Sequence, residues 1–136
     1  MLSNANQGIT KTKYLSDNQI IVPSAPHFAV GIVVDQTAGT EDETTGRTIV
    51  KAGTPLTGNL DARTTAFTKA VTSGSPTATS NAVGILQHDV DVTVDDGNGE
   101  LLLIGVVNVN RLDSDVQALI TAEVKAALPT VKLIKL

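Results

Sequence analysis

Cysteine and tryptophan are absent from this chain of 136 residues, and its only phenylalanines and tyrosine are Phe28, Phe67 and Tyr14. The lack of cysteine excludes disulfides, thiolate nucleophiles and zinc–cysteine sites. So few aromatic rings argue against a pocket that stacks on sugars. No apolar run approaches the roughly 20 residues that span a bilayer, and residues 1–10 lack the basic-then-apolar order of a signal peptide. We therefore expect a soluble, unsecreted protein with no membrane partner.

Positive charge is also sparse. The chain has 10 basic and 14 acidic residues, for a formal net charge of −4. The basic residues are scattered, whereas a nucleic-acid surface needs them gathered to neutralise phosphates. Direct nucleic-acid binding is not expected. The length suits a single domain with one core.

The strand pattern is clearest in residues 81–111. Residues 87–94 alternate in polarity as a half-buried strand does. The two faces of this strand are predicted as an apolar one and a solvent one: Val90, Val92 and Val94 against Asp89, Asp91 and Thr93. The Asp-Gly and Asn-Gly pairs in residues 95–99 predict a tight hairpin turn with positive φ angles. Residues 101–109 are nearly continuous in Leu, Ile and Val, which predicts a strand covered on both faces for much of its length.

The remaining pattern predicts a mainly β fold: a compact β-rich domain, β-clip or tulip-like, with one short C-terminal helix and an extended N-terminal arm. The helix is expected at about 114–127, capped by Asp113 or Ser114 and ended by Pro129. Gly31 is expected to mark a bulge or a close backbone approach, and Gly53 a turn. Strands are expected at 19–22, 28–34, 47–56, 63–71 and 131–136, with a short helix at 64–66 as the alternative in the fourth of these segments, and residues 72–80 are expected to form a loop.

The arm is predicted to cover residues 1–26, with the β domain at 27–136. Residues 1–12 are small and polar without periodicity, so alone they are expected to be flexible and to need a partner surface. A first strand tucked onto its own domain is the alternative. The residues expected to grip a partner are Leu2, Ile9, Lys11, Lys13, Tyr14 and Leu15.

The search for catalytic chemistry is negative. His27 and His88 belong to no paired-ligand spacing. The three carboxylates of residues 41–43 are expected to lie in a solvated loop. Residues 53–58 have the glycine spacing of a phosphate-binding loop but lack the following Lys-Ser/Thr, and residues 89–95 match a calcium loop only at their first few positions. No catalytic, cofactor-binding or metal residue is predicted, and we do not expect an enzyme.

Three segments together resemble a known family. Lys51-Ala-Gly-Thr-Pro-Leu56, Ala82-Val-Gly-Ile-Leu86 and the strand at 102–108 occur in the order seen in the head decoration (capsid-stabilising) proteins of tailed bacteriophages, of the phage lambda type. The resemblance covers residues 47–111, about half of the chain.

This resemblance implies a homotrimer on the outer surface of an icosahedral capsid, at three-fold and quasi-three-fold positions. Such proteins stabilise the expanded, DNA-filled head by binding the major capsid protein, with the arm adding a strand to a capsid sheet. The protein would then reside in the host cytoplasm during assembly and afterwards on the virion, with no cofactor. Two alternatives remain open: a β-clip module for a small ligand or host glycan, and an enzyme subunit that uses His88, Asp89 or Asp91 across a trimer interface.

Overall fold

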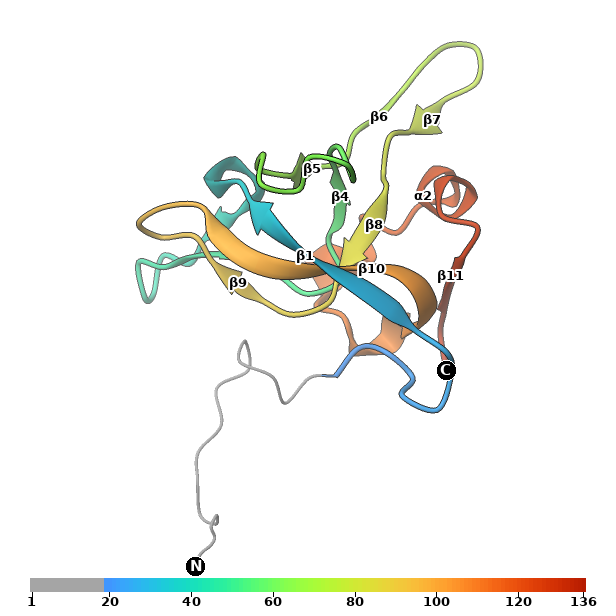
Figure 1. Cartoon of the computed structure of the whole chain (residues 1–136), viewed down its shortest axis with the longest axis horizontal. Coiled ribbons are helices and arrows are strands. Elements are labelled where there is room, and N and C mark those ends of the chain that lie inside the picture. Colours follow the sequence, from blue (N-terminus) through green and yellow to red (C-terminus); the bar gives the residue numbers. More distant parts are fainter. Residues whose placement is uncertain (1–18) are drawn as a thin grey trace, which may run out of the picture.

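A computed structural model describes residues 19–136 (Figure 1). The fold is mainly β, with several antiparallel sheets and, within the described part, short helices near the C-terminus. The sequence-based prediction of fold class is therefore confirmed.

One long strand, β10 (Gly97–Asn108), organises the main sheet and crosses the centre of the molecule (Figure 1). It pairs antiparallel with β1 (Phe28–Val34) and β8 (Gly84–Leu86), and parallel with β11 (Val131–Ile134). Beyond β8 the sheet continues to β4 (Pro55–Thr57) and β5 (Thr68–Lys69). Leu101, Leu102 and Val107 on β10 are fully buried. The apolar run in the sequence thus makes β10 the centre of the domain.

Two smaller sheets and two 3-10 helices complete the β part. The first sheet contains β2 (Thr40–Glu41), β3 (Thr48–Val50) and β9 (Val90–Asp91). The second is a hairpin of β6 (Thr72–Ser73) and β7 (Thr79–Ser80), which projects from the body in Figure 1 where a plain loop was predicted. The 3-10 helices are η1 (Gln36–Ala38) and η2 (Val109–Arg111).

The predicted helix at 114–127 is in fact two helices, α1 (Ser114–Gln117) and α2 (Ala122–Ala127). Thr121 interrupts them in an extended conformation, and its hydroxyl oxygen accepts a hydrogen bond from Val124 N at 3.3 Å. A threonine side chain competes with the helix for backbone partners, so it favours an N-cap over a helix interior. The apolar stripe still faces inward, because Val116 and Val124 are both buried.

The predicted turn at residues 95–99 is also wrong. Gly97 and Gly99 belong to β10, where they pair with Val34 and Ile32 of β1, and neither has a positive φ. A Cβ on Gly97 would collide with the side chain of Val90, and one on Gly99 would approach Val90 Cγ2 to 2.9 Å. These glycines therefore let β10 pass closely beneath Val90, and they do not form a turn.

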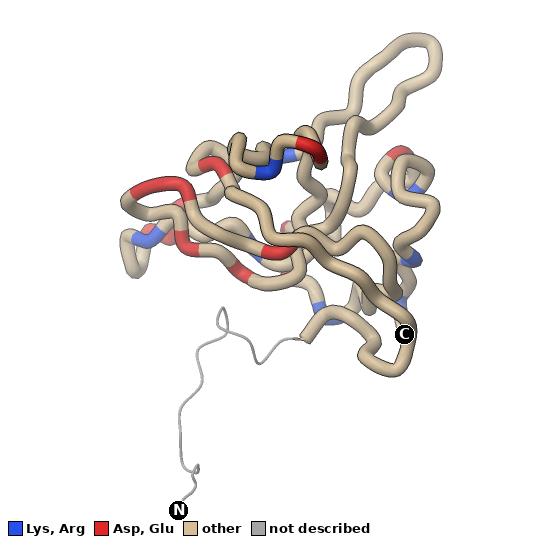
Figure 2. The backbone as a smooth tube through the Cα atoms, viewed as in Figure 1, with Lys and Arg blue, Asp and Glu red and all other residues tan. Residues whose placement is uncertain are grey.

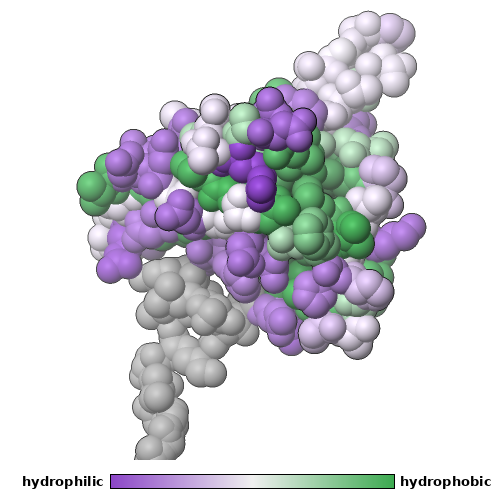
Figure 3. All heavy atoms as spheres, in the orientation of Figure 1, coloured by the Kyte–Doolittle hydropathy of each residue, from purple (hydrophilic) through white to green (hydrophobic). Residues whose placement is uncertain are grey.

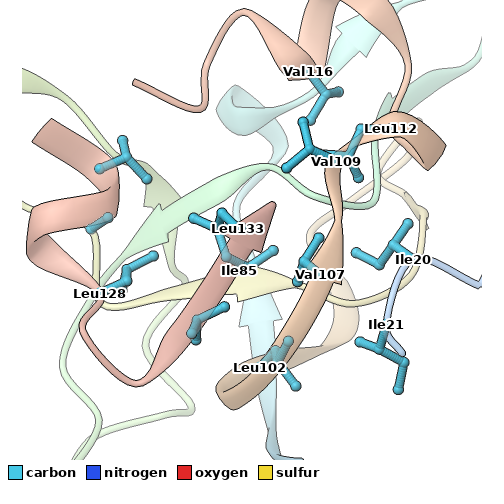
Figure 4. Close-up of a cluster of buried hydrophobic side chains, with 13 residues drawn as sticks. Ile20, Ile21, Ile85, Leu102, Val107, Val109, Leu112, Val116, Leu128 and Leu133 are labelled. Atoms are coloured by element: carbon cyan, nitrogen blue, oxygen red, sulfur yellow. The ribbon is translucent and has the colours of Figure 1, made fainter. Parts of the chain in front are cut away.

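The buried side chains form two clusters on either side of the sheet region. The first lies under α1, α2 and β11 and is shown in Figure 4; its largest members include Ile20, Ile85, Leu102, Leu112, Leu128 and Leu133. The second is built around Phe67 and includes Val34, Leu56, Leu86, Val90, Val92 and Leu101. Strands β8 and β10 contribute side chains to both clusters, so the same pair of strands connects the two clusters.

Residues 20–22 belong to this domain and not to the arm predicted at 1–26. Ile20 and Ile21 are 1% and 5% exposed. Ile21 forms an antiparallel bridge to Val107, and Asn108 N donates to Ile20 O at 2.8 Å. Since Val107 also pairs with β11, Ile21 and β11 flank β10 on opposite sides. The domain thus begins by residue 20 and not at residue 27, whereas Leu2, Ile9, Lys11, Lys13, Tyr14 and Leu15 lie outside the described residues.

The two glycines singled out in the sequence differ in their surroundings. Gly53 has φ +95°, and a Cβ there would collide with the Leu112 side chain, whereas a Cβ on Gly31 would meet nothing within 4 Å. The predicted turn at Gly53 is confirmed, but the irregularity in β1 lies between Phe28 and Ala29 and not at Gly31.

We expect Gly53→Ala to lower the free energy of unfolding by about 1–3 kcal/mol, because both the backbone conformation and the space oppose a side chain. Gly31→Ala is the matched control and should leave stability unchanged or raise it by up to about 1 kcal/mol. Urea unfolding followed by circular dichroism measures both. Equal effects of the two substitutions would contradict this assignment.

Candidate functional site

The histidines and carboxylates of the described residues do not form a metal centre. No group of three or more His, Asp or Glu side chains among residues 19–136 is arranged to hold a metal ion. His27 and His88 are both exposed, and His27 Nδ1 lies 3.1 Å from the backbone oxygen of Ala25.

The described residues do form a pocket of about 490 Å³ on the acidic side of the molecule. It lies between the loop around residues 40–45 and the segment 111–113, at the end of η2. Figure 2 shows that most of the acidic positions lie in the same half of the molecule as the β9–β10 turn. The charged residues that line the pocket are Glu41, Asp42, Glu43, Arg47, Lys51, Asp89, Arg111 and Asp113, and Ile49, Ala52 and Leu112 supply apolar surface.

Lys51 joins one wall of the pocket to the start of α1. Its Nζ lies 3.2 Å from Asp113 Oδ2 and 3.0 Å from Asp115 Oδ2. Partial burial lowers the pKa of Lys51, but the hydrogen bonds and charges of Asp115 and Asp113 outweigh it, so the net pKa is raised. Burial raises the pKa of Asp115, but the contact with Lys51 outweighs it and the net pKa is lowered. These exposed pairs fix the pocket wall more than they stabilise the fold.

Asp89 lies partly inside the structure, although the alternation predicted it on the solvent face. Its Oδ1 accepts a hydrogen bond from Ala52 N at 2.7 Å, and it lines the pocket beside the Gly53 turn. Burial raises the pKa of Asp89 above its ordinary value, against the lowering by the Ala52 hydrogen bond. The prediction holds for Asp91, which is exposed and lies 3.5 Å from an Arg47 nitrogen. Hydrogen bonds from Thr93 lower the pKa of Asp91.

A second feature is an apolar surface on the main sheet. Phe28 and Ile104 are partners across β1 and β10, and they are 54% and 45% exposed. Ile134 and Leu136, at the C-terminal end of the chain, are exposed as well. Figure 3 shows apolar side chains at the surface on this side of the molecule. Apolar pairs that remain exposed on a sheet are typical of an interaction surface.

The third feature is the contact between Gln19 and Arg111. Arg111 Nη1 donates a hydrogen bond to the backbone oxygen of Gln19 at 3.1 Å. Arg111 also lines the pocket. Gln19 therefore lies one hydrogen bond away from a residue that lines the pocket, and it is followed along the chain by the buried Ile20 and Ile21.

Comparison of the chain with known protein families, curated proteins and solved structures finds no match. Among residues 19–136, none of the helices has the length and apolar character needed to cross a membrane.

Proposed function

We propose that this protein is a structural head decoration protein of a tailed bacteriophage. As a homotrimer it binds the outer surface of the icosahedral capsid at three-fold and quasi-three-fold sites. It contacts the major capsid protein and stabilises the expanded, DNA-filled head. It has no catalytic role and needs no cofactor.

The observation that carries this proposal is the burial of Ile20 and Ile21, the residues that connect the N-terminal segment to the domain. Eighteen residues precede Gln19, and they include Leu2, Ile9, Tyr14 and Leu15 among small polar residues. Because Ile20 and Ile21 are buried along β10, a pull on the preceding segment is resisted by the core of the domain. A clamp needs this arrangement: a gripping segment on one side and a rigid body on the other.

The exposed apolar pair on β1 and β10 supports assembly into a trimer. Phe28 and Ile104 lie next to each other in the main sheet, and both side chains are exposed. Burying such a pair between copies removes apolar surface from water at a gain of roughly 25 cal/mol per Å². Three linked arms then bind the capsid far more tightly than one, because the second and third contacts are intramolecular.

The alternative of a binding module for a ligand or host glycan would use the pocket beside Arg111. Its volume of about 490 Å³ falls in the range of small-molecule sites. However, Phe28 and Phe67 are not among its lining residues, and its charged rim offers no platform for stacking on a sugar ring. The decoration role therefore remains the better proposal.

Deleting residues 1–13 tests the proposal. The truncated protein should remain a folded trimer, because the two core clusters formed by the described residues are left intact, and it should no longer bind expanded heads built from its own major capsid protein. Co-sedimentation with purified heads measures binding, and sedimentation equilibrium measures the oligomer. A variant in which residues 2–13 are shuffled controls for length and composition. Binding of the truncated form at the level of the full chain would refute the assignment of the arm.

A further inference from the structure

The outer edge of β1 is open over the first half of the strand. β1 is the end strand of the main sheet, next to β10. The backbone groups of Val33 point away from β10, because Val33 N donates to Arg63 O at 3.4 Å and Val33 O accepts from Phe67 N at 2.7 Å. In an antiparallel strand, the backbone groups of every second residue point to the same side. The N–H and C=O groups of Ala29 and Gly31 therefore also point away from β10.

The register of β10 agrees with this orientation. Gly31 pairs with Glu100, and Glu100 O accepts a hydrogen bond from Gln87 N at 2.9 Å on the side of β8. Because the backbone groups of Glu100 are turned towards β8, Gly31 and Glu100 form a pair that exchanges no hydrogen bonds. Within residues 19–136, no hydrogen bond uses the outward groups of Ala29 or Gly31. Two donors and two acceptors thus remain available along this edge.

The space beside the edge is also open. A groove of about 710 Å³ lies between β1 and residues 60–64. Gly31 is exposed, and a Cβ on it would meet nothing within 4 Å. Proteins usually protect an exposed edge with a charged residue, a proline or a covering segment. Residues 28–34 contain neither a charged residue nor a proline, and residues 63–67 cover only the second half of β1. The first half can therefore accept an added strand.

The charge beside this edge indicates what the added strand must carry. Glu100 is exposed and makes no ion pair with another described residue. Paired residues on neighbouring strands share a face of the sheet, so a residue added opposite Gly31 would lie two strand spacings, or about 10 Å, from Glu100. Glycine has no side chain in between, so a lysine or arginine at that position can reach the Glu100 carboxylate. Asp61 and Arg63 in the groove wall balance each other, which leaves Glu100 to set the sign.

We propose that the open edge of β1 at Ala29 and Gly31 binds an extended segment of a partner protein as an added strand, with a lysine or arginine opposite Gly31. Backbone hydrogen bonds supply the pairing, and Glu100 selects the basic residue. The inference goes beyond the proposed function, because here the domain accepts a strand, whether or not the partner belongs to a capsid. The edge of β1 in a second copy fits less well, since β1 has no basic residue that could face Glu100.

A short synthetic peptide tests the backbone pairing. The probe is the capped, fluorescein-labelled peptide Thr-Val-Thr-Lys-Thr-Val-Thr, and its fluorescence anisotropy is followed as the full chain is added. A methyl group on the backbone nitrogen of the lysine removes the donor that faces Gly31, and it should weaken binding by at least about tenfold. The matched control carries the methyl group on the next threonine, whose N–H points away from β1. The control should bind as the unmodified peptide does.

A reversal of charge tests the role of Glu100. The peptide with a central lysine should bind roughly two- to fivefold more tightly than the same peptide with a central glutamate. Glu100→Lys should reverse this preference. The matched control is Glu43→Lys, which makes the same change in net charge at an exposed position that does not line the groove. This control should keep the preference for lysine.

Gly31→Pro closes the edge, because it removes the outward N–H, and an edge strand tolerates proline where that group faces solvent. It should abolish binding of every peptide while circular dichroism shows the fold retained; if the variant does not fold, the two methylated peptides decide. The proposal is overturned if the full chain does not bind the lysine peptide at roughly 1 mM, or if methylation on either side has the same effect. It is also overturned if Gly31→Pro lowers the mass of the free protein in sedimentation equilibrium, which would assign the edge to a second copy.

Discussion

Replacing Phe67 with alanine should lower the free energy of unfolding by about 3–5 kcal/mol. Its side chain is fully buried at the centre of the second core cluster, together with Val34 and Leu86. The ring also fills the space above Gly58, where an added Cβ would lie 2.5 Å from Phe67 Cδ2. Removing the ring leaves a cavity between β1 and β4 that the surrounding strands can close only in part, because their positions are fixed by β10.

The backbone of Phe67 adds a reason for the large effect. Phe67 N donates to Val33 O at 2.7 Å, and Asp35 N donates to Phe67 O at 2.9 Å. The residue thus connects the 63–67 segment to the end of β1, although the sequence pattern there is weak. A single domain is typically stable by about 5–15 kcal/mol, so this loss is a large share of the total.

The other phenylalanine is the matched control. Phe28 is 54% exposed in the single chain, so at a protein concentration low enough to keep the chain monomeric Phe28→Ala should change the unfolding free energy by less than about 1 kcal/mol. Urea unfolding by circular dichroism, at one fixed protein concentration for both variants, measures the difference. Similar losses for the two substitutions would show that the ring of Phe67 is not the centre of this cluster.

Local patterns in the sequence were sufficient to predict the central strands. The continuous apolar run of β10 and the β-branched run of β1 each predict a strand, and this prediction does not require knowing which strands pair with them. The alternation of Val131 and Leu133 with Lys132 similarly specifies β11, with the valine and leucine buried and the lysine exposed. In these segments the burial pattern and the backbone preference agree.

The same reasoning failed where one residue pattern is compatible with two different local structures. An Asp-Gly or Asn-Gly pair is typical of a tight turn, but glycine is also required where another chain segment approaches closely. At Gly97 and Gly99 the approaching group is Val90, and only the packing of β9 against β10 reveals which purpose applies. The break between α1 and α2 is similar, because Thr121 is compatible with both a helix interior and a cap.

The candidate site could not be predicted from the sequence, because the residues that contact one another in it are far apart along the chain. Lys51 and Asp115 are 64 residues apart, and Asp89 and Ala52 are 37 residues apart. Each residue taken alone has the composition of a solvated loop or strand. The acidic loop at 41–43 is exposed as expected, but its place in the same pocket as Arg111 depends on the turn at Gly53 and on η2.

The position of the domain boundary leads to the second large prediction. Ile20→Ala should lower the free energy of unfolding by about 2–5 kcal/mol, because Ile20 is 1% exposed and packs in the first core cluster. If residues 1–26 formed a detachable arm, the same substitution would have no effect on the domain. The measurement therefore distinguishes an arm that starts before residue 20 from one that extends to residue 26.

Ile134 provides the control for this substitution, since it is an isoleucine at 42% exposure on the neighbouring strand β11. Ile134→Ala should cost less than about 1 kcal/mol, because its side chain is already partly in water. The effect of Ile20→Ala should persist in the protein that lacks residues 1–13, because the core cluster in which Ile20 packs consists of described residues that the deletion leaves in place. A loss that vanishes on truncation would mean that Ile20 acts through the preceding residues. A loss that remains would establish that the root of the arm is part of the core, so that a force on the arm is transmitted directly to β10.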